Sequence, residues 1–346
     1  MKSISLFNNK GGVSKTTTTF NLGWILAEQG YRVLMVDADP QCNLTGMVMG
    51  FDSHKDLEKF YEEDPKNNLK SALRPAFESQ PVPLSAVDCI EVERREGLYL
   101  LPGHVGLSEY EVQLGLAQEL TGSIQALQNL PGAIRHLYSI TADALDADFV
   151  LIDLSPGLGS INQNIVATSD YLIIPTTPDV FSVMALDSLS RALPRWSAWL
   201  DKASSMEVFQ DAAYPLPKPQ LKFLGLIAQR YRARNALPTR AFQTYFDALE
   251  AATKEKLVPA LGNIGALLPH VDYEANSDPD SNYRLASIPD FNALIANSQQ
   301  TQKPVFALTQ ADVQRVGSVW ETTRDNIAAF RATFEELGRR VVDLTS

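Results

Sequence analysis

The chain has 346 residues, of which 45% are hydrophobic and 21% are charged, so it can bury a large core in about two domains or in one large α/β domain. Its formal net charge of −11 argues against a protein coated in basic surface, so any nucleic-acid contact must come from a local patch. The 2 cysteines are too few for a disulfide framework or a Cys-rich zinc site. We find no apolar run of membrane-spanning length and no signal peptide, and therefore expect a cytoplasmic protein.

A strand, a glycine-containing loop and a helix are predicted at the start of the chain. Residues 3–8 are apolar enough for a buried parallel strand, and residues 16–29 carry apolar side chains at helical spacing. Two adjacent glycines between them let backbone N–H groups converge on an anion, and the positive end of the helix adds to the attraction. We therefore predict a phosphate-binding loop in which Lys15 contacts the β- and γ-phosphates of ATP and the Thr16 hydroxyl ligates Mg²⁺. The predicted ATP-binding residues of this loop are Lys10, Gly11, Gly12, Val13, Ser14, Lys15, Thr16 and Thr17.

The loop departs from the general pattern G-x-x-x-x-G-K-[ST], because Asn9 and Ser14 stand where that pattern has glycine. It satisfies K-G-G-x-x-K-T instead, with an additional lysine, Lys10, at its front. This variant resembles the deviant Walker A motif of the ParA/MinD family of ATPases. The resemblance implies that Lys10 reaches across a dimer interface to the nucleotide of the partner subunit, so that a homodimer sandwiches two ATP molecules. A small side chain at position 14 should fit, with an effect on nucleotide affinity that the sequence leaves open.

Two aspartates follow the second predicted strand, residues 32–36. The carboxyl ends of parallel strands meet at one edge of a sheet, so Asp37 and Asp39 should emerge beside the phosphate loop. The segment resembles the second signature of the same family, which implies that Asp39 positions the attacking water and that Asp37 helps to organise the magnesium shell. A carboxylate suits the first task because it accepts a hydrogen bond from water and orients it.

Residues 51–96 form a charged, proline-containing segment that we interpret as a surface insertion of short helices. Such an insertion can recognise a partner or be a solvated excursion, and the second reading is favoured. Residues 98–101 are predicted to form a third strand. Residues 107–138 are predicted to be mostly helical, with a break near residues 130–132.

Four apolar residues end in an aspartate over residues 149–153, which is typical of a Walker B strand. A buried strand does not tolerate a carboxylate unless a cation or a partner is near, so we predict that Asp153 faces the Mg²⁺ site. A further buried strand is predicted over residues 171–175. A helix follows over residues 180–200, in which Pro194 indicates a kink or a boundary.

Residues 212–246 contain lysines and arginines but no aspartate or glutamate. Residues 221–228 within them are predicted to form a strand. In the ParA/MinD family this strand end contributes a polar side chain to the adenine, a role that would fall to Gln229, and arginines that follow form part of a nonspecific DNA-binding face. The candidate DNA-binding residues are Arg230, Arg232, Arg234 and Arg240. Aligned cations suffice for such binding, which should weaken steeply with salt. The alternative is that these arginines pair with acidic residues or contact the partner subunit.

The last part of the sheet is predicted from weaker patterns. Residues 263–268 are a possible strand, and residues 272–282 are predicted to form an exposed loop. Residues 285–291 resemble the last strand of the ParA/MinD family, whose Ile-Pro turn packs on the adenine base. This resemblance makes Pro289 and Asp290 candidates for base contact, although Asp290 could also cap a helix.

Residues 311–342 are predicted to form a final helix with apolar residues at three- and four-residue steps. A MinD-type protein would end in a basic amphipathic membrane helix. From Glu321 onward, five acidic residues stand against four arginines, so anionic lipid would gain little from this helix. We therefore expect it to pack on the rest of the domain.

Together these patterns predict an α/β fold, a doubly wound and mostly parallel sheet with helices on both faces, in a single domain over residues 1–346. The resemblance implies a Mg²⁺-dependent ATPase that dimerises on ATP and turns over slowly until a ParB-like partner stimulates it. It also implies nonspecific DNA binding, association with the nucleoid, and a role in DNA or cargo partitioning. The alternatives are a MinD-like regulator on a membrane surface and a relative of the nitrogenase iron protein. The last is disfavoured because neither Cys42 nor Cys89 follows the predicted Walker B turn.

Overall fold

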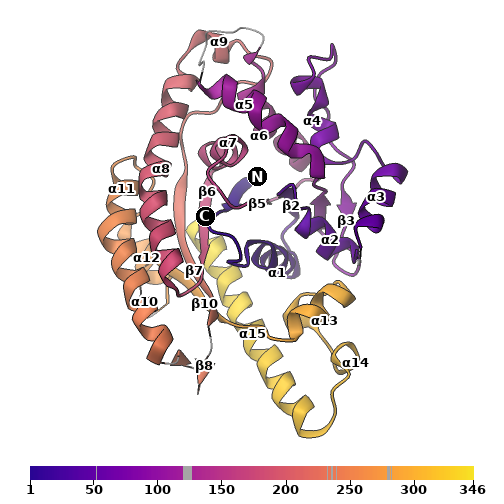
Figure 1. Cartoon of the computed structure of the whole chain (residues 1–346), viewed down its shortest axis with the longest axis vertical. Coiled ribbons are helices and arrows are strands. Elements are labelled where there is room, and N and C mark those ends of the chain that lie inside the picture. Colours follow the sequence, from indigo (N-terminus) through magenta and orange to yellow (C-terminus); the bar gives the residue numbers. More distant parts are fainter. Residues whose placement is uncertain are drawn as a thin grey trace.

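One eight-stranded sheet runs through the centre of the molecule in the order β10-β7-β6-β1-β5-β2-β4-β3 (Figure 1). Its strands are β1 Lys2–Leu6, β2 Val33–Ala38, β3 Ile90–Glu91, β4 Leu98–Leu101, β5 Phe149–Leu154, β6 Tyr171–Thr176, β7 Lys222–Tyr231 and β10 Arg284–Pro289. Neighbouring strands are parallel except for β3 and β4, which pair antiparallel at one edge.

The computed structural model describes residues 1–51, 53–119, 127–231, 233–234, 237–238, 240–278, 281 and 283–346. A short antiparallel ribbon joins β8 Ala233–Arg234 to β9 Leu237–Pro238.

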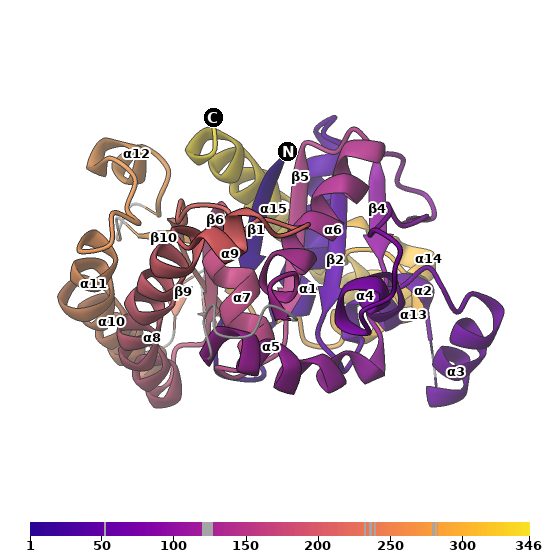
Figure 2. The same cartoon turned by 90° about the horizontal axis from the view of Figure 1, so that it is seen from above.

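Helices cover both faces of this sheet, as the rows of helices above and below the strands in Figure 1 show. The elements that pack into the core on one face are α1 Lys15–Glu28, α2 Asn43–Met49, α13 Leu294–Thr301, η4 Val305–Ala307, α14 Gln310–Val313 and α15 Gly317–Leu344. Those on the other face are α4 Leu69–Phe77, η1 Val105–Glu109, α5 Tyr110–Glu119, α6 Leu130–Ala144, α7 Ser160–Thr168, α8 Val180–Ser204, α9 Glu207–Gln210, α10 Arg240–Ala252, η3 Thr253–Leu257 and α11 Val258–Gly262. Two more helices, α3 His54–Glu63 and α12 His270–Ala275, lie at the periphery (Figure 2). The predicted fold class is confirmed.

The central strands are buried at every position, which explains their continuous apolar runs. A parallel strand that is covered on both faces has no solvated side to fill with polar residues. The chain passes from β1 through α1 to β2, returns through α6 to β5, and then continues on the other side of β1 to β6 and β7. The strand order therefore reverses beside β1, where an open α/β sheet leaves a crevice at the carboxyl ends of its strands.

The segment over residues 51–96 is only partly the surface insertion that the sequence predicts. Helix α3 has no fully buried residue among its described side chains. Helix α4, in contrast, buries Leu69, Leu73 and Phe77 in the core against α6. These three residues recur every four positions, so they form one apolar face on the helix. The prediction of a solvated excursion is wrong for α4.

Three predictions near the end of the chain need correction. Residues 263–268 form a turn and an extended segment rather than a strand, and the predicted loop over 272–282 includes most of helix α12. The final helix is two helices, because Gln314 and Gly317 adopt left-handed φ values of 52° and 58° between α14 and α15. Conversely, α8 continues through Pro194 to Ser204. The middle of the predicted helical region, residues 120–126, lies outside the described residues.

Candidate active site

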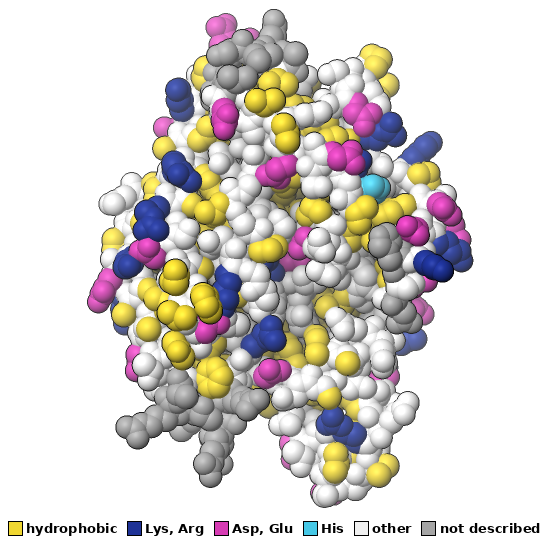
Figure 3. Space-filling model, viewed as in Figure 1, with side chains coloured by type: hydrophobic (Ala, Val, Ile, Leu, Met, Phe, Trp, Pro, Cys, Tyr) yellow, Lys and Arg dark blue, Asp and Glu magenta, His cyan; other side chains and the backbone are white. Residues whose placement is uncertain are grey.

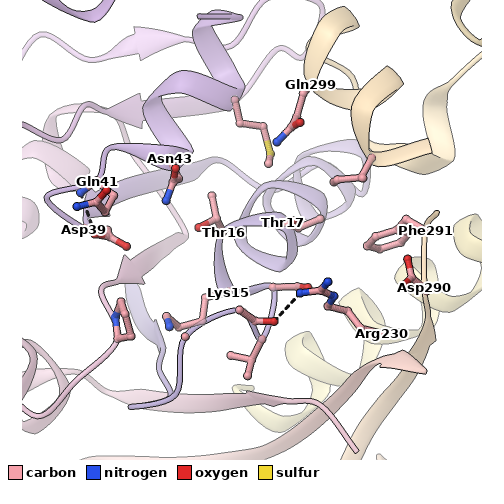
Figure 4. Close-up of a pocket in the computed structure, with 17 residues that line it drawn as sticks. Lys15, Thr16, Thr17, Asp39, Gln41, Asn43, Arg230, Asp290, Phe291 and Gln299 are labelled. Atoms are coloured by element: carbon pink, nitrogen blue, oxygen red, sulfur yellow. Dashed lines mark hydrogen bonds between the residues drawn. The ribbon is translucent and has the colours of Figure 1, made fainter. Parts of the chain in front are cut away.

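The carboxyl ends of β1, β2 and β5 meet at one edge of the sheet and carry polar side chains predicted from the sequence. The parallel register sets Leu6 of β1 and Asp37 of β2 opposite Asp153 of β5. A cavity of about 500 Å³ opens over this edge (Figure 4). Its lining residues are Gly11, Gly12, Val13, Ser14, Lys15, Thr16, Thr17, Asp39, Gln41, Asn43, Met47, Pro156, Arg230, Asp290, Phe291, Ile295 and Gln299. Seven consecutive loop residues therefore share one cavity with Asp39.

The loop between β1 and α1 has the backbone shape that a phosphate-binding loop needs. Gly12 has a φ of 71° and Ser14 a φ of 60°, so the chain turns twice through left-handed conformations. Ser14 adopts a left-handed conformation that favours glycine, which costs about 1 kcal/mol of conformational free energy for a residue with a side chain. Helix α1 begins at Lys15 without a side-chain N-cap hydrogen bond. Its first N–H groups are therefore available to an anion in the cavity.

Lys15 is a buried cation held by its own loop. Its Nζ donates to the carbonyl oxygen atoms of Asn8 at 3.3 Å and Lys10 at 3.4 Å. Burial lowers the pKa of this ammonium group, and the nearby carboxylates of Asp153 and Asp39 oppose that shift. A bound polyphosphate would supply further negative charge beside the ammonium and favour its protonated form. Lys15 lines the cavity, and its contact with the β- and γ-phosphates stays a prediction.

The three aspartates have different surroundings. Asp37 accepts hydrogen bonds on Oδ2 from the amide of Thr45 at 2.8 Å and from its hydroxyl at 2.6 Å. Burial nevertheless raises the pKa of Asp37 to about 6. Asp39 lines the cavity and accepts a hydrogen bond from the amide of Gln41 at 2.9 Å. Asp153 is fully buried, and neither of its carboxylate oxygen atoms has a hydrogen-bond partner among the described residues.

The surroundings of Asp153 fit a divalent cation. Burial, followed by the charge of Asp37, raises the pKa of Asp153 well above its usual value although the Thr16 hydroxyl and the Lys15 ammonium oppose the shift, so a further cation would favour the ionised carboxylate. In the described part of the chain no cluster of three His, Cys, Asp or Glu side chains could hold a metal unaided. Mg²⁺ typically uses one or two protein groups together with phosphate oxygens and water. Thr16 and Asp153 would hold it here, with Asp37 behind them, and the ion would neutralise phosphate charge.

The far side of the cavity is lined by Asp290, one of the two candidates for base contact, whereas Pro289 is not among the lining residues. Asp290 and Phe291 follow β10 and line the cavity with Ile295 of α13, and Pro289 ends β10 beside them (Figure 4). Gln229 does not line the cavity. It is buried behind the phosphate loop, where its Nε2 donates to the Thr18 hydroxyl at 2.6 Å. The predicted contact of Gln229 with adenine is therefore replaced by a role in supporting the loop.

Arg230, a candidate for DNA binding, lies instead in the cavity. Its Nη1 donates to the carbonyl of Gly12 at 2.9 Å, and its φ of 58° turns the chain at the end of β7 (Figure 4). Arg230 is exposed and lines the cavity beside the loop, a position that the sequence does not predict for it. The candidate Arg232 lies outside the described residues. The backbones of Arg234 and Arg240 belong to β8 and α10, but their side chains are outside the described part of the structure.

Comparison with known proteins identifies the family. A protein-family model described as an AAA domain matches residues 1–202, more than half of the chain. The chain belongs to the ParA/MinD family of P-loop ATPases. The chromosome partitioning protein ParA of Caulobacter vibrioides is 29% identical over 238 residues, which are 68% of this chain and 72% of that protein. An uncharacterized protein of Mycobacterium tuberculosis is 35% identical over 205 residues, 58% of this chain, and the match spans 55% of its length.

A solved structure supports the ParA/MinD fold over the whole chain. The structure of pNOB8 ParA bound to nonspecific DNA matches with a TM-score of 0.55 and 21% sequence identity, and the match covers 99% of this chain and 98% of that one. At this identity the likeness concerns the fold. The likeness in fold continues beyond residue 202, where the family model ends, and includes the half of the sheet that contains β7 and β10.

The lysine that distinguishes the ParA/MinD loop is turned away from the cavity of its own chain. Lys10 forms an ion pair with Asp179, the N-cap of α8. Its Nζ also donates to the hydroxyl of Thr177 at 2.6 Å and that of Ser182 at 3.2 Å. Lys10 is not among the residues that line the cavity. A role at a partner's nucleotide would require the ammonium to leave Asp179.

The C-terminal helix of this ParA/MinD-family chain is packed on the body of the protein. Helix α15 buries one apolar face in the core that α1 and β10 share. The buried residues include Ile327, Phe330, Phe334, Leu337 and Val341. These side chains are thus already in contact with protein, which disfavours a MinD-type membrane helix. Among the helices that the structure describes, none is both long and apolar enough to cross a bilayer.

Asp153→Asn should make the nucleotide-free protein more stable at neutral pH while removing its response to magnesium. The folded-state pKa of Asp153 is raised, so stability is lost as pH rises from the unfolded value near 4, and the penalty is present at pH 8. We expect the variant to melt at least about 2 °C above the wild type at pH 8, and ATP with Mg²⁺ to raise its melting temperature no more than ATP with EDTA. Differential scanning fluorimetry measures both. Asp143→Asn, at an exposed carboxylate, is the control and should change neither. Unchanged magnesium-dependent stabilisation would contradict the metal assignment.

Several residues that line the cavity were not predicted from the sequence. These are Gln41, Asn43, Met47, Pro156, Arg230, Phe291, Ile295 and Gln299. Phe291 directly follows Asp290, and Gln41 stands two positions after Asp39, so closeness in the sequence to predicted site residues is a signal for both. Ile295 and Gln299 lie four residues apart on α13 and face the cavity together, a spacing that becomes informative only once this helix is located.

Proposed function

We propose that the chain is a Mg-ATP-dependent ATPase switch that dimerises on binding ATP and acts in the partitioning or positioning of a cargo. The observation that carries the proposal is that the phosphate loop, Asp39 and the base-side residues line one cavity. Lys15 and the first turn of α1 bind the phosphates. Asp39 accepts a hydrogen bond from the attacking water and aligns it with the γ-phosphate. Hydrolysis is slow until a ParB-like activator engages the dimer.

Dimerisation is supported by the surface that surrounds Lys10. At the start of α8, beside Asp179, the side chains of Val180, Phe181 and Met184 are 49%, 65% and 62% exposed. Figure 3 shows hydrophobic side chains gathered over this end of α8. Burying such side chains against a second copy is favourable at about 25 cal/mol per Å². In this proposal the second copy covers these residues. The Lys10 ammonium then breaks its ion pair with Asp179 and contacts the nucleotide of the partner subunit.

Nonspecific DNA binding is the further part of the proposal. In the sequence, the segment that follows β7 has no acidic residue up to Phe246 and carries Arg232, Arg234 and Arg240, so it is a basic segment in a chain whose net charge is −11. A dimer would contain two such segments and roughly double the number of phosphate contacts, which strengthens binding at low salt. Similarity to proteins named for chromosome partitioning and for a nonspecific DNA complex favours this function over a purely protein-borne switch. A nucleoid-associated location would follow.

Reversing two of these arginines should separate DNA binding from nucleotide binding. The double variant Arg232→Glu with Arg234→Glu is expected to lose at least about 10-fold in affinity for random-sequence DNA in the presence of ATP, because several phosphate contacts become repulsive. Its affinity for ATP should stay within about twofold of the wild type. Fluorescence anisotropy with labelled DNA across a salt series measures the loss. Arg324→Glu, at an exposed residue of α15, is the matched charge control. Equal DNA affinity of the double variant would move the DNA-binding face elsewhere.

One experiment distinguishes this function from a membrane-borne switch. Protein with ATP, ADP or no nucleotide is mixed with random-sequence DNA and, separately, with liposomes rich in anionic lipid. We expect ATP-dependent retention on DNA and none on liposomes. Retention on liposomes alone would favour the MinD-like alternative.

A further inference from the structure

The hydroxyl of Tyr61, on helix α3, joins two backbone segments that end at the active site. It donates a hydrogen bond to the carbonyl of Gly103, which follows β4, at 3.0 Å. The same oxygen lies 3.3 Å from Sγ of Cys42. Burial raises the pKa of the Cys42 thiol to about 12, so the thiol is neutral; its proton can be donated to the tyrosine oxygen or to the carbonyl oxygen of Pro40, which lies 3.7 Å from Sγ. One side chain of the peripheral α3 thus bridges two segments of the sheet edge.

Cys42 ends the turn that carries Asp39. Its amide donates to the carbonyl of Asp39 at 2.8 Å, which closes the turn. Cys42 has a φ of 52°, a left-handed conformation that a residue with a side chain rarely adopts. Such a conformation persists only where surrounding contacts hold it. The hydrogen bond to Tyr61 is one of the contacts that hold it here.

Gly103 leads to the second aspartate. Its amide donates to the hydroxyl of Thr45 at 3.0 Å, and this hydroxyl donates to Asp37 at 2.6 Å. A Cβ atom at Gly103 would lie 3.0 Å from both Cγ and the carbonyl oxygen of Asp37, so the backbone of Gly103 directly abuts this residue. Tyr61 is therefore linked to Asp37 and to Asp39 by two separate routes of two or three contacts.

Tyr61 is one of the residues that attach α3 to its surroundings, and Phe60 beside it packs on Phe51. The ring of Tyr61 packs on His104 with a centroid distance of 4.3 Å. Elsewhere α3 stands off from α2, since a cavity of about 940 Å³ is lined by Leu57 of α3 and Met47 of α2. Tyr61 is not among the residues that line the nucleotide cavity. It must therefore act on the reaction through the residues that it holds.

We propose that Tyr61 is a positioning residue for ATP hydrolysis, which fixes the turn from Asp37 to Cys42 so that Asp39 is aligned with the attacking water. The proposal rests on the proposed function, in which Asp39 orients that water. In this proposal α3 contributes to ATP hydrolysis, because the position of α3 determines where the Tyr61 hydroxyl lies.

Tyr61→Phe tests the proposal, since it keeps the ring on His104 and removes both hydrogen bonds. With Mg-ATP at saturation we expect the single-turnover hydrolysis rate to fall about 5- to 10-fold, the change that corresponds to losing one or two hydrogen bonds. The dissociation constant for ATP should stay within about twofold, because Tyr61 does not border the nucleotide. Cys42→Ala should reproduce part of the loss, and the double variant should lose less than the product of the two single effects. Tyr245→Phe, at a partly exposed tyrosine of α10, is the control and should hydrolyse ATP at the wild-type rate.

The outcomes separate this proposal from the proposed function. A wild-type hydrolysis rate in Tyr61→Phe overturns the positioning role, provided that Asp39→Ala measured alongside is inactive. A rate that falls only in parallel with ATP affinity or with the melting temperature also overturns it, because a purely structural role would produce that pattern. If Asp39→Ala keeps the wild-type rate, the proposed function of the turn fails, and the role of Tyr61 fails with it.

Discussion

Asp39→Ala is expected to bind ATP normally but to hydrolyse it at least about 100-fold more slowly than the wild type. Asp39 lines the cavity, and its Oδ1 is held by the amide of Gln41 at 2.9 Å, so the carboxylate is fixed before substrate binds. Removing it leaves the attacking water without the acceptor that orients it. The variant should therefore accumulate as an ATP-bound dimer. Single-turnover hydrolysis and size-exclusion chromatography with ATP measure the two effects.

A matched control for this experiment is Asp290→Asn, on the base side of the same cavity. At saturating ATP its hydrolysis rate should remain within about threefold of the wild type, because it is remote from the γ-phosphate in the proposed binding mode. A fully active, monomeric Asp39→Ala protein would contradict the role given to this residue.

Lys15→Ala is expected to weaken ATP binding by at least about 100-fold. The ammonium is buried beside Asp153 and Asp39, and its removal deletes the main positive charge in the phosphate loop that lines the cavity. A charge-assisted hydrogen bond to phosphate contributes about 1.5 to 3 kcal/mol, and the loss of the neighbouring charge adds to this value. Isothermal titration calorimetry with a nonhydrolysable ATP analogue measures the change.

Lys10→Ala separates the two lysines of the loop. Because Lys10 pairs with Asp179 and does not line its own cavity, the variant should bind ATP as a monomer within about threefold of the wild-type affinity. It should fail to dimerise.

If Lys15→Ala bound the analogue with unchanged affinity, the phosphate-loop assignment would be wrong.

The part of the site that is contiguous in the sequence could be predicted. The phosphate loop lies within a few residues of one strand end, so the spacing of its glycines and lysines reflects its geometry directly. Asp39 and Asp153 could also be located, because each follows a buried strand and parallel strands bring their carboxyl ends together. Their surroundings required the structure: only the fold reveals that Asp153 lacks a partner among the described residues.

The exit of β7 shows why other site residues could not be predicted. Successive side chains of a strand point to opposite faces, so of Gln229 and Arg230 only one is expected to face the nucleotide. The sequence does not determine which. In the structure Gln229 supports the loop from behind, and the left-handed φ of Arg230 directs the arginine into the cavity. The first of the four candidate DNA-binding arginines thus lines the cavity beside the loop.

The role of the segment over residues 51–96 also depended on tertiary contacts. Its prolines and charges favoured a surface excursion, yet α4 carries an apolar face that completes the core. Tyr61 on α3 contacts Cys42, at the end of the Asp39 turn, and Gly103, which abuts Asp37. Neither contact has a signal in the local sequence, since the residues involved are separated by tens of positions.

The central claim is that ATP converts this chain from a monomer to a dimer in which the ammonium group of Lys10 contacts the nucleotide bound by the partner subunit. Multi-angle light scattering of Asp39→Ala with Mg-ATP, with Mg-ADP and without nucleotide tests it most directly, with Lys10→Ala in the same background for comparison. The account predicts twice the mass of a single chain with ATP alone, and a single-chain mass for the Lys10 variant under every condition. A single-chain mass with ATP, or an ATP-dependent dimer that persists without Lys10, would contradict it.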